Sequence, residues 1–434
     1  MFDFNTQAQK FKFQGEITVP GDKSIAHRAI MFGSLADGVT QISNFMYADD
    51  LTVTTRIFKQ LGAKIHSEIS NKDMIIKGMK HQFQPVSEPL NVENVGTMRS
   101  LLLGVLASVP NQYKIIGGKY LSQSPMDHLL ELLAKMGVNL QQSSENALPL
   151  QITGSQSLEG ITYQQDISNA QIKSSLIMAG LYAQSPTEII RKLPTRNHTE
   201  VMANYFGANI EVTPDIIKIN PLETNLLGQS ITIPGDFSSA ALYVAGTLLS
   251  EGSQMVLPKV SLNSTRIGLL RVVKQMGAQI GVKNQSIDAV EPFGDLVVKS
   301  QKLHGTTVTA EEVPFIIDEI PLIALIASQA DGKTVIEGIH DVYLQIDDRL
   351  RNMRTELAKL GIVMEVHQDS IVIAGNQEIK VKDDVDSHND HRIAMMLCIA
   401  SILTDSPFKI KNIEAIDISY PGFISDLNKV LVAK

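Results

Sequence analysis

The chain repeats one short phrase, ITVPGDKS at residues 17–24 and ITIPGDFS at residues 231–238. The two copies lie 214 positions apart (231 − 17) in a chain of 434 residues. Each copy combines β-prone residues, a Pro-Gly turn and an aspartate at the expected N-cap of a helix, followed by small and apolar residues. The repetition predicts two similar halves, and it marks where the chain passes from one half to the other.

Length and composition narrow the class of protein. The chain is long for a single hydrophobic core, which predicts two domains. Hydrophobic residues make up 44% and charged residues 19%, as in a globular protein. No apolar stretch reaches the roughly 18–20 residues that a membrane span needs. The net charge of −8 argues against a broad nucleic-acid-binding surface but leaves room for a small basic pocket.

The single cysteine and the first residues bear on the compartment. Cys398 has no second cysteine to pair with, and it lies in the apolar run MMLCIAS, where we expect a small buried side chain. The first residues, MFDFNTQAQK, lack the basic start and apolar core of a signal peptide. We therefore expect a cytoplasmic protein.

Six apolar segments share one design. Each begins with polar or charged residues and continues with turns rich in Ala, Gly, Ser, Leu and Ile. A helix that is apolar on nearly all sides is a buried helix, and small residues let such helices approach closely. The predicted buried helices lie within residues 22–37, 96–109, 168–184, 236–252, 317–332 and 389–404.

A second, amphipathic type of helix follows each of the first five segments. Its end is marked by a glycine before β-prone residues, as in LGAKI at 61–65 and MGVNL at 136–140. The last unit is expected to end in the helix ISDLNKVLVAK. Six units of roughly 70 residues thus predict two similar α/β domains of three units each, with a solenoid as the structural alternative. The glycines are Gly62, Gly137, Gly207, Gly277 and Gly361.

The repeated phrase also predicts the domain bounds. We place the changes of domain close to Val19-Pro20 and Ile233-Pro234. The first domain would then span residues 20–233, and the second would combine residues 1–19 with residues 234–434.

Polar residues gather at the starts of the buried helices. A helix start presents unpaired N–H groups and partial positive charge, which favour phosphate and carboxylate. If the repeats are related by symmetry, these starts converge on one cleft suited to anionic ligands. They carry Lys23, Ser24, His27 and Arg28; Asn94, Gly96, Thr97 and Arg99; Ser168, Asn169, Gln171 and Lys173; Asp236, Ser238 and Ser239; Asp318 and Glu319; and His388, Asp390, His391 and Arg392.

Each cluster also has a structural explanation. Asp22 and Asp236 are expected to be N-caps rather than catalytic groups. Arg28 could form an ion pair within a domain, and His391 could be a hydrogen-bonded structural histidine. His388 lies three residues before it, but no third ligand for a metal site is evident. The recurrence at one helix end, rather than any single cluster, indicates an anion site.

Six motifs carry a resemblance to a known family: GDKSIAHRA (21–29), RNHTE (196–200), PGDFSSAA (234–241), NSTR (263–266), IDEIP (317–321) and NDHRIAM (389–395). They closely resemble motifs of the 5-enolpyruvylshikimate-3-phosphate synthase family, the 3-phosphoshikimate 1-carboxyvinyltransferases. The resemblance runs over nearly the whole chain. It implies two inverted α/β domains, each built of three βαβαββ units with a cleft between them.

The resemblance also implies an activity. The enolpyruvyl group of phosphoenolpyruvate would pass to the 5-hydroxyl of shikimate 3-phosphate with release of phosphate, in the shikimate pathway. This reaction needs a base for the hydroxyl, an acid for the methylene carbon and cations for the anionic substrates. Domain closure would exclude water and align the reactants. The implied partners are these two substrates, without metal, organic cofactor, nucleic acid or membrane, and we expect a monomer.

Roles follow residue by residue from the resemblance. Lys23 would touch both substrates and relay a proton, Asp318 would accept or orient the hydroxyl proton, and His391 would face phosphoenolpyruvate. Bidentate arginines suit both carboxylate and phosphate. The candidate catalytic residues are Lys23, Asp318 and His391, and the candidate substrate-binding residues are Lys23, Ser24, Arg28, Asn94, Gly96, Thr97, Arg99, Ser168, Asn169, Gln171, Arg196, Asp318, Gln345, Arg349 and Arg392.

The chain departs from the family pattern in four places. The family's Gly-Asn-Ser/Ala-Gly-Thr turn begins with Glu93 here and is one residue shorter before its arginine. The arginine of the Arg-Pro-Met loop, which binds phosphoenolpyruvate in the family, is Ser124. Gln345 and Ile346 replace a lysine and a glutamate credited with proton transfer. Finally, the family's Ser-Ser/Ala-Gln is Asn169-Ala170-Gln171.

These departures keep other functions open. Losing one charged hydrogen bond can cost about 1.5–3 kcal/mol, and losing a general acid or base roughly 10²–10⁴ in rate. Asp347 would replace the missing glutamate only if its segment is a loop, because in a strand it would face the other side. The alternatives are an enolpyruvyl transferase with another acceptor and a catalytically weak ligand-binding protein. A UDP-N-acetylglucosamine enolpyruvyl transferase is disfavoured, because Cys398 lies in an apolar helix rather than in a mobile loop.

Overall fold

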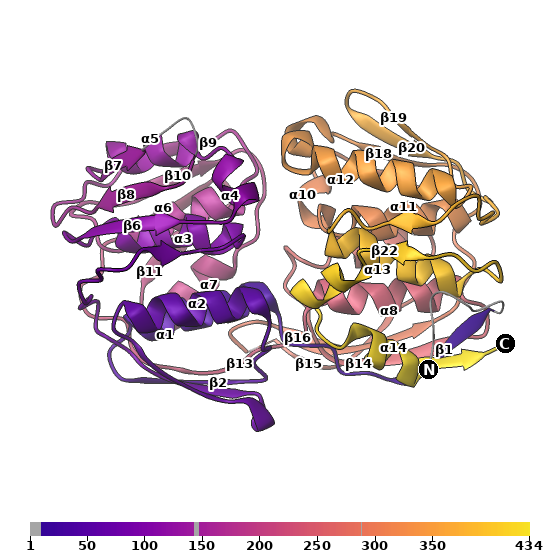
Figure 1. Cartoon of the computed structure of the whole chain (residues 1–434), viewed down its shortest axis with the longest axis horizontal. Coiled ribbons are helices and arrows are strands. Elements are labelled where there is room, and N and C mark those ends of the chain that lie inside the picture. Colours follow the sequence, from indigo (N-terminus) through magenta and orange to yellow (C-terminus); the bar gives the residue numbers. More distant parts are fainter. Residues whose placement is uncertain (1–9, 143–146, 288) are drawn as a thin grey trace. The chain divides into compact units, whose positions relative to one another are not determined.

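The computed structural model describes residues 10–142, 147–287 and 289–434, with the backbone alone at residues 341–347. Its contacts divide the chain into two units (Figure 1). The continuous unit is Lys23–Ile233, and the discontinuous unit joins Met1–Asp22 with Pro234–Lys434. The first division therefore lies between Asp22 and Lys23, slightly later than the expected Val19-Pro20.

The six predicted buried helices are confirmed. Nearly every residue in them is shielded from solvent, as their uniformly apolar composition requires. Three belong to the continuous unit and three to the discontinuous unit. They are α1 (Lys23–Leu35), α3 (Gly96–Leu106), α6 (Ala170–Gly180), α8 (Phe237–Leu249), α11 (Ile320–Gln329) and α13 (His391–Ile402).

The helices of the second type are confirmed as well. The glycine that ends each of them has a φ between 80° and 119°, the left-handed conformation that glycine adopts without strain. The expected C-terminal helix is α14 (Phe423–Val430), but it is shorter than predicted, because Leu431–Ala433 form the strand β23 that pairs with β1 (Phe11–Glu16). The other five are α2 (Asp49–Gln60), α5 (Asp127–Lys135), α7 (His198–Tyr205), α9 (Gly268–Gln275) and α12 (His340–Lys359).

The continuous unit contains three four-stranded sheets, with the orders β13-β2-β4-β3, β5-β6-β8-β7 and β11-β12-β10-β9. In each sheet one parallel pair joins an antiparallel hairpin, the pairing of a βαβαββ unit. The strands are β2 (Val39–Ser43), β3 (Lys64–Glu68), β4 (Asp73–Lys77), β5 (Leu90–Asn91), β6 (Gln112–Ile116), β7 (Asn139–Gln142), β8 (Leu150–Thr153), β9 (Thr162–Gln165), β10 (Thr187–Arg191), β11 (Asn209–Val212), β12 (Ile216–Asn220) and β13 (Ser230–Thr232). Short helical turns η1 (Ile69–Asn71) and α4 (Lys119–Gln123) complete the unit.

The discontinuous unit has sheets with the orders β15-β16-β14-β1-β23, β17-β18-β20-β19 and β21-β22. Its helices α8, α11 and α13 pack against one another, and Figure 1 shows them stacked within this unit. The strands are β1 (Phe11–Glu16), β14 (Gln254–Ser261), β15 (Gly281–Ser286), β16 (Phe293–Lys299), β17 (Thr307–Val308), β18 (Thr334–Glu337), β19 (Met364–Val366), β20 (Ser370–Ile373), β21 (Val385–Asp386), β22 (Ile410–Lys411) and β23 (Leu431–Ala433), with α10 (Val313–Ile316) and η2 (Ile413–Ile418) between them.

The two copies of the repeated phrase exchange strands. Strand β1 precedes α1 in the chain but pairs in parallel with β14, which follows α8. Strand β13 precedes α8 but pairs in parallel with β2, which follows α1. Between the copies, the amide of Asp22 donates to the carbonyl of Pro234 at 2.9 Å, and the amide of Asp236 donates to that of Pro20 at 2.7 Å. The β-prone residues 17–19 follow β1 rather than forming part of it.

Small residues allow the buried helices to approach closely. A Cβ atom added to Gly104 of α3 would lie 2.2 Å from the carbonyl oxygen of Ser175 in α6. A Cβ added to Gly246 of α8 would lie 2.4 Å from the ring of Phe13 in β1. Larger side chains would separate these elements, so glycine at these two positions is a packing requirement. No helix in the described part of the chain is long and apolar enough to cross a membrane.

Candidate active site

The predicted site residues fall in both units, and the structure gathers each set at helix starts. In the continuous unit they lie at the starts of α1, α3 and α6 and in the segment before α7. In the discontinuous unit they lie at the starts of α11 and α13 and along α12.

The start of α1 carries two cations in different settings. Lys23 Nζ lies 2.7 Å from Asp50 Oδ2 of α2, and both side chains keep about a fifth of their surface exposed. Arg28 is buried and donates to Thr199 Oγ1 at 2.7 Å, to Ser174 Oγ at 3.1 Å and to the carbonyl of Ser24 at 2.9 Å. Arg28 therefore ties α1 to α6 and α7, whereas Lys23 stays closer to solvent.

The starts of α3 and α6 meet through one glutamine. Gln171 Nε2 lies 3.5 Å from Thr97 Oγ1, and Gln171 Oε1 accepts a hydrogen bond from Ser100 Oγ at 3.2 Å. Asn169 caps α6, since its side-chain oxygen accepts from the amides of Gln171 and Ile172. The structure thus brings Thr97, Asn169 and Gln171 together.

The start of α7 and the segment before it are held against the α6 region by three polar contacts. Ser168 Oγ donates to the carbonyl of Pro194 at 2.8 Å. Lys173 Nζ donates to the carbonyl of Arg196 at 2.6 Å and lies 2.5 Å from Glu200 Oε1. These bonds place Arg196 beside the α6 start.

Arg99 is buried and bonded to backbone. Its Nη1 donates to the carbonyls of Leu121 at 2.9 Å and Ser124 at 2.8 Å, and burial lowers the pKa of its guanidinium. Arg99 therefore holds the loop in which a serine occupies the position of the family arginine.

The carboxylate in the altered turn is neutralised. Glu93 has a φ of 50°, and its Oε1 lies 2.8 Å from Arg56 Nη1, with both side chains close to half exposed. Asn94 lies against Gly118, where a Cβ would come within 2.3 Å of the asparagine Oδ1. Gly96 begins α3 directly after this turn. The guanidinium of Arg56 thus balances the carboxylate that departs from the family pattern in this turn.

In the discontinuous unit, the starts of α11 and α13 are joined by an ion pair. Arg392 Nη2 lies 2.9 Å from Asp318 Oδ1, and its Nη1 donates to the Asp318 carbonyl at 3.4 Å. Burial lowers the pKa of Arg392 to about 10, and the charge of Arg349 adds to this effect. A small pocket between Ser238, Glu319 and these two residues opens at the same place.

A second ion pair fastens α12 to the start of α13. Arg349 Nε lies 2.7 Å from Asp390 Oδ2, and Asp390 caps α13 by accepting from the Arg392 amide at 2.8 Å. The pKa of Asp390 is lowered overall, because Arg349, His391 and Arg392 outweigh the opposing effect of burial. His391, the first residue of α13, follows this cap directly.

Residues 345–347 lie in α12, so the segment that replaces the family's Lys-Glu pattern is helical rather than a strand or a loop. The side chains of Gln345, Ile346 and Asp347 lie outside the described part of the chain.

Arg266 ends the motif NSTR, and no role for it is predicted from the sequence. Its guanidinium is 3% exposed and lies within 4 Å of three carboxylates, those of Asp22, Asp236 and Asp318. Asp236 is an N-cap as expected, accepting from the amides of Ser238 and Ser239. One feature of the sequence indicates that Arg266 matters: it ends the motif NSTR, just before a predicted amphipathic helix.

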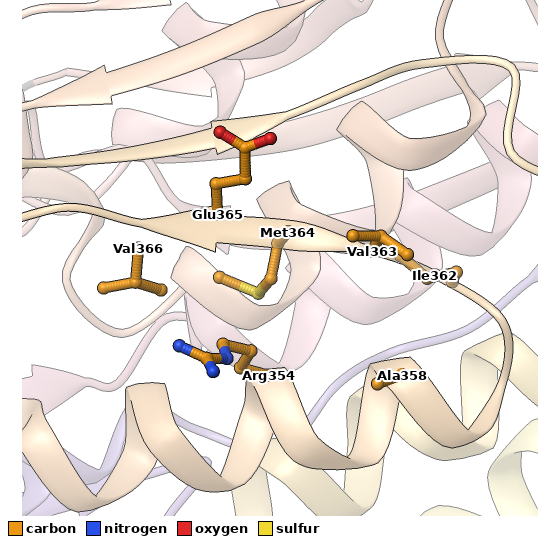
Figure 2. Close-up of a pocket in the computed structure, with 7 residues that line it drawn as sticks. All are labelled: Arg354, Ala358, Ile362, Val363, Met364, Glu365 and Val366. Atoms are coloured by element: carbon orange, nitrogen blue, oxygen red, sulfur yellow. The ribbon is translucent and has the colours of Figure 1, made fainter.

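Another pocket lies elsewhere in the discontinuous unit. It has a volume of about 370 Å³ and lies between α12 and β19, lined by Arg354, Ala358 and residues 362–366 (Figure 2). It contains none of the predicted site residues.

The chain is similar to known proteins over nearly its whole length. The family model described as EPSP synthase (3-phosphoshikimate 1-carboxyvinyltransferase) matches residues 8–427. The 3-phosphoshikimate 1-carboxyvinyltransferase of Leuconostoc mesenteroides is 39% identical over 98% of both chains. That of Bacillus subtilis is 38% identical over 96% of this chain and 97% of its own.

Solved structures agree with these sequence relationships. EPSP synthase from Acinetobacter baumannii is similar with a TM-score of 0.87 and 33% identity, covering 99% of both chains. The enolpyruvyl transferase NikO from Streptomyces tendae has a TM-score of 0.77 at 16% identity, covering 98% of this chain and 96% of its own, and supports the fold alone.

Proposed function

Because the chain belongs to the EPSP synthase family, we propose that it transfers the enolpyruvyl group of phosphoenolpyruvate to the 5-hydroxyl of shikimate 3-phosphate and releases phosphate. The observation that carries the proposal is the pairing of Asp318 with Arg392 at the starts of α11 and α13, in a chain matched by the family over almost its whole length. A carboxylate and a guanidinium at adjoining helix starts can serve a proton-accepting step beside an anionic substrate.

The reaction has two stages. In the first, the hydroxyl O–H bond breaks, the proton passes to Asp318, and the oxygen forms a bond to the central carbon of the enolpyruvyl group. The methylene carbon takes up a proton in the same stage, which gives a tetrahedral intermediate carrying both phosphates. In the second stage the bond between the central carbon and the phosphate oxygen breaks, phosphate leaves with that electron pair, and the methyl group returns a proton to the residue that donated it, which restores the double bond. Lys23 and His391 are the proposed proton donors, since both lie at helix starts that favour anionic ligands.

Substrate binding is assigned to the remaining helix starts. The pocket for shikimate 3-phosphate is proposed to use Lys23, Ser24, Arg28 and the α6 start, and that for phosphoenolpyruvate the arginines of α12 and α13. The joining of Thr97, Asn169 and Gln171 supports the first assignment. The full set is Lys23, Ser24, Arg28, Asn94, Gly96, Thr97, Arg99, Ser168, Asn169, Gln171, Arg196, Asp318, Gln345, Arg349 and Arg392.

The altered turn is compatible with this proposal. Glu93 would repel anionic substrates if its charge were unbalanced, but Arg56 lies 2.8 Å away. The missing guanidinium at Ser124 is not replaced by Arg99 in this conformation, because Arg99 Nη1 donates to two backbone carbonyls. Weaker binding of phosphoenolpyruvate than in relatives with the family arginine is the expected consequence.

The proposal also covers the compartment, the oligomeric state, the domain bounds and the cofactor requirement of the enzyme. We propose a cytoplasmic monomer with domain bounds at residues 20–233 and at residues 1–19 with 234–434, which needs neither metal nor organic cofactor. The lone, buried Cys398 supports the compartment, and the unit divisions near these bounds support the domains.

The test is phosphate release with both substrates present, against controls that lack either one. Mass spectrometry of the product should show shikimate 3-phosphate with an added enolpyruvyl group. Asp318→Asn should lower the rate by about 10²–10⁴ if the carboxylate accepts the proton. The matched control Asp405→Asn, at an exposed loop position, should leave the rate unchanged. Release no greater than in the single-substrate controls would refute the proposal.

A further inference from the structure

Arg266 is buried, and the hydrogen bonds of the turn in which it lies fix its position. It follows β14 and precedes α9, and Asn263 organises the turn by accepting hydrogen bonds from the amide and the hydroxyl of Thr265 at 2.9 and 2.7 Å. The other side of the Asn263 amide donates to the buried Glu291 at 2.9 Å. The turn is thereby fixed at both ends, and the arginine side chain extends into the unit rather than into solvent.

The guanidinium of Arg266 collects groups that are distant in the sequence. It lies 3.8 Å from Asp22 and 3.6 Å from Asp236, the two aspartates of the repeated phrase. It also lies 3.1 Å from Asp318 Oδ2 and donates to Ser238 Oγ at 2.9 Å. Burial alone would lower its pKa, but the surrounding carboxylates raise it, so the guanidinium is firmly charged.

Asp318 therefore lies between two arginines whose side chains differ in how strongly they are held and in how far they are exposed. Its Oδ2 faces Arg266, whose side chain is 3% exposed, and its Oδ1 faces Arg392, whose side chain is 18% exposed. Arg266 is also held by two further carboxylates and a hydroxyl, whereas Arg392 lines the small pocket at the α11 and α13 starts. Of the two, Arg392 is the one placed to exchange Asp318 for an arriving anion.

We infer that Arg266 is the positioning residue of the proposed reaction: it holds Oδ2 of Asp318 so that Oδ1 is directed to the acceptor hydroxyl once Arg392 turns to the anionic donor. The inference rests on the proposed function. It assigns separate tasks to two arginines that touch one carboxylate. A guanidinium suits the fixed task, because its fork can hold several oxygens at once in one orientation.

The test compares Arg266→Lys with wild type in the phosphate-release assay. Lysine keeps the charge but loses the fork, so kcat should fall roughly 10- to 100-fold while KM for each substrate changes less than about 3-fold. The matched control Arg271→Lys alters an arginine of α9 that donates to the carbonyl of Ser264, and it should keep wild-type kcat. Shikimate 3-phosphate affinity, measured by calorimetry, should be the same in all three proteins.

A double-mutant cycle separates positioning from general structural support. If Arg266 acts through Asp318, adding Arg266→Lys to Asp318→Asn should lower the residual kcat less than about 3-fold. An equal loss in both backgrounds, or a higher KM with unchanged kcat, would overturn the inference. Ser238→Ala provides a second route if Arg266→Lys does not fold, since it removes one partner of the guanidinium. It should lower kcat in the wild-type background but not in Asp318→Asn, and equal losses in both would again overturn the inference.

The outcomes also distinguish the inference from the proposed function. A wild-type protein without phosphate release refutes the function, and with it the inference, before any variant is made. An active wild type with an unimpaired Arg266→Lys variant refutes the inference alone.

Discussion

The buried pair of Lys173 in α6 and Glu200 in α7 gives the sharpest prediction about the continuous unit. The two side chains are 1% and 3% exposed, and Nζ lies 2.5 Å from Oε1. Burial lowers the pKa of Lys173, and Glu200 acts in the opposite direction. Lys173→Met would leave the Glu200 carboxylate buried without its counter-charge.

The expected cost of Lys173→Met is about 3–5 kcal/mol of unfolding free energy, the usual range when one partner of a buried ion pair is removed. Two details place it at the upper end. Glu200 Oε2 has no hydrogen-bond partner among the described residues, so no second hydrogen bond would stabilise the buried carboxylate once Lys173 is removed. The carbonyl of Arg196 also loses the donor that lies 2.6 Å away.

Removing both charges should cost far less than removing one. In Lys173→Met with Glu200→Leu, no charge remains buried, so we expect a stability within about 2 kcal/mol of wild type. Urea unfolding followed by far-ultraviolet circular dichroism measures the free energies, and hydrogen exchange at the α6 and α7 amides assigns the loss to the continuous unit. A single variant as stable as the double variant would refute the reasoning.

Three further predictions test other parts of the chain. Burial, with Lys23 and Arg28 nearby, holds the pKa of His27 well below 6.5. Its contribution to stability is therefore complete above pH 6.5 and falls below it by up to about 1.4 kcal/mol per pH unit. His27→Gln should flatten this acid dependence in urea titrations, and a curve parallel to that of the wild type would contradict the assignment. Ser124→Arg with Ile346→Glu should raise kcat/KM for phosphoenolpyruvate about tenfold or more, and an unchanged value would mean that the site has been rebuilt. Gly104→Ala should cost about 3 kcal/mol, because its Cβ would meet a backbone oxygen at 2.2 Å, and a Tm within about 2 °C of wild type would argue against such tight packing.

Local chemistry made most of the secondary structure predictable. The uniformly apolar segments became buried helices because no face of them suits water, and the glycine after each amphipathic helix adopts a positive φ. The pairing of β1 with β14 was beyond such reasoning, because the two strands join across more than half of the chain. Sequence pattern identifies a strand but leaves its partner open when the connection is long.

The functional site, like the fold, could be predicted from the sequence only in part. Lys23, Asp318 and Arg392 could be selected from motifs at helix starts. Arg266 could not, because its significance depends on three carboxylates from separate parts of the chain. The setting of Glu93 could not be predicted either, since the sequence shows the extra carboxylate but not the arginine, 37 positions earlier (93 − 56), that lies beside it.

The strand exchange has a consequence for the order in which the protein can form. Strand β1 leaves a ribosome before the continuous unit does, yet its parallel partner β14 lies beyond that whole unit. The continuous unit, by contrast, contains every strand of its own sheets, including β13. Synthesis in the direction of the chain therefore allows Lys23–Ile233 to fold while β1 is still unpaired, and the sheet of the discontinuous unit can form only after β14 and β23 have emerged.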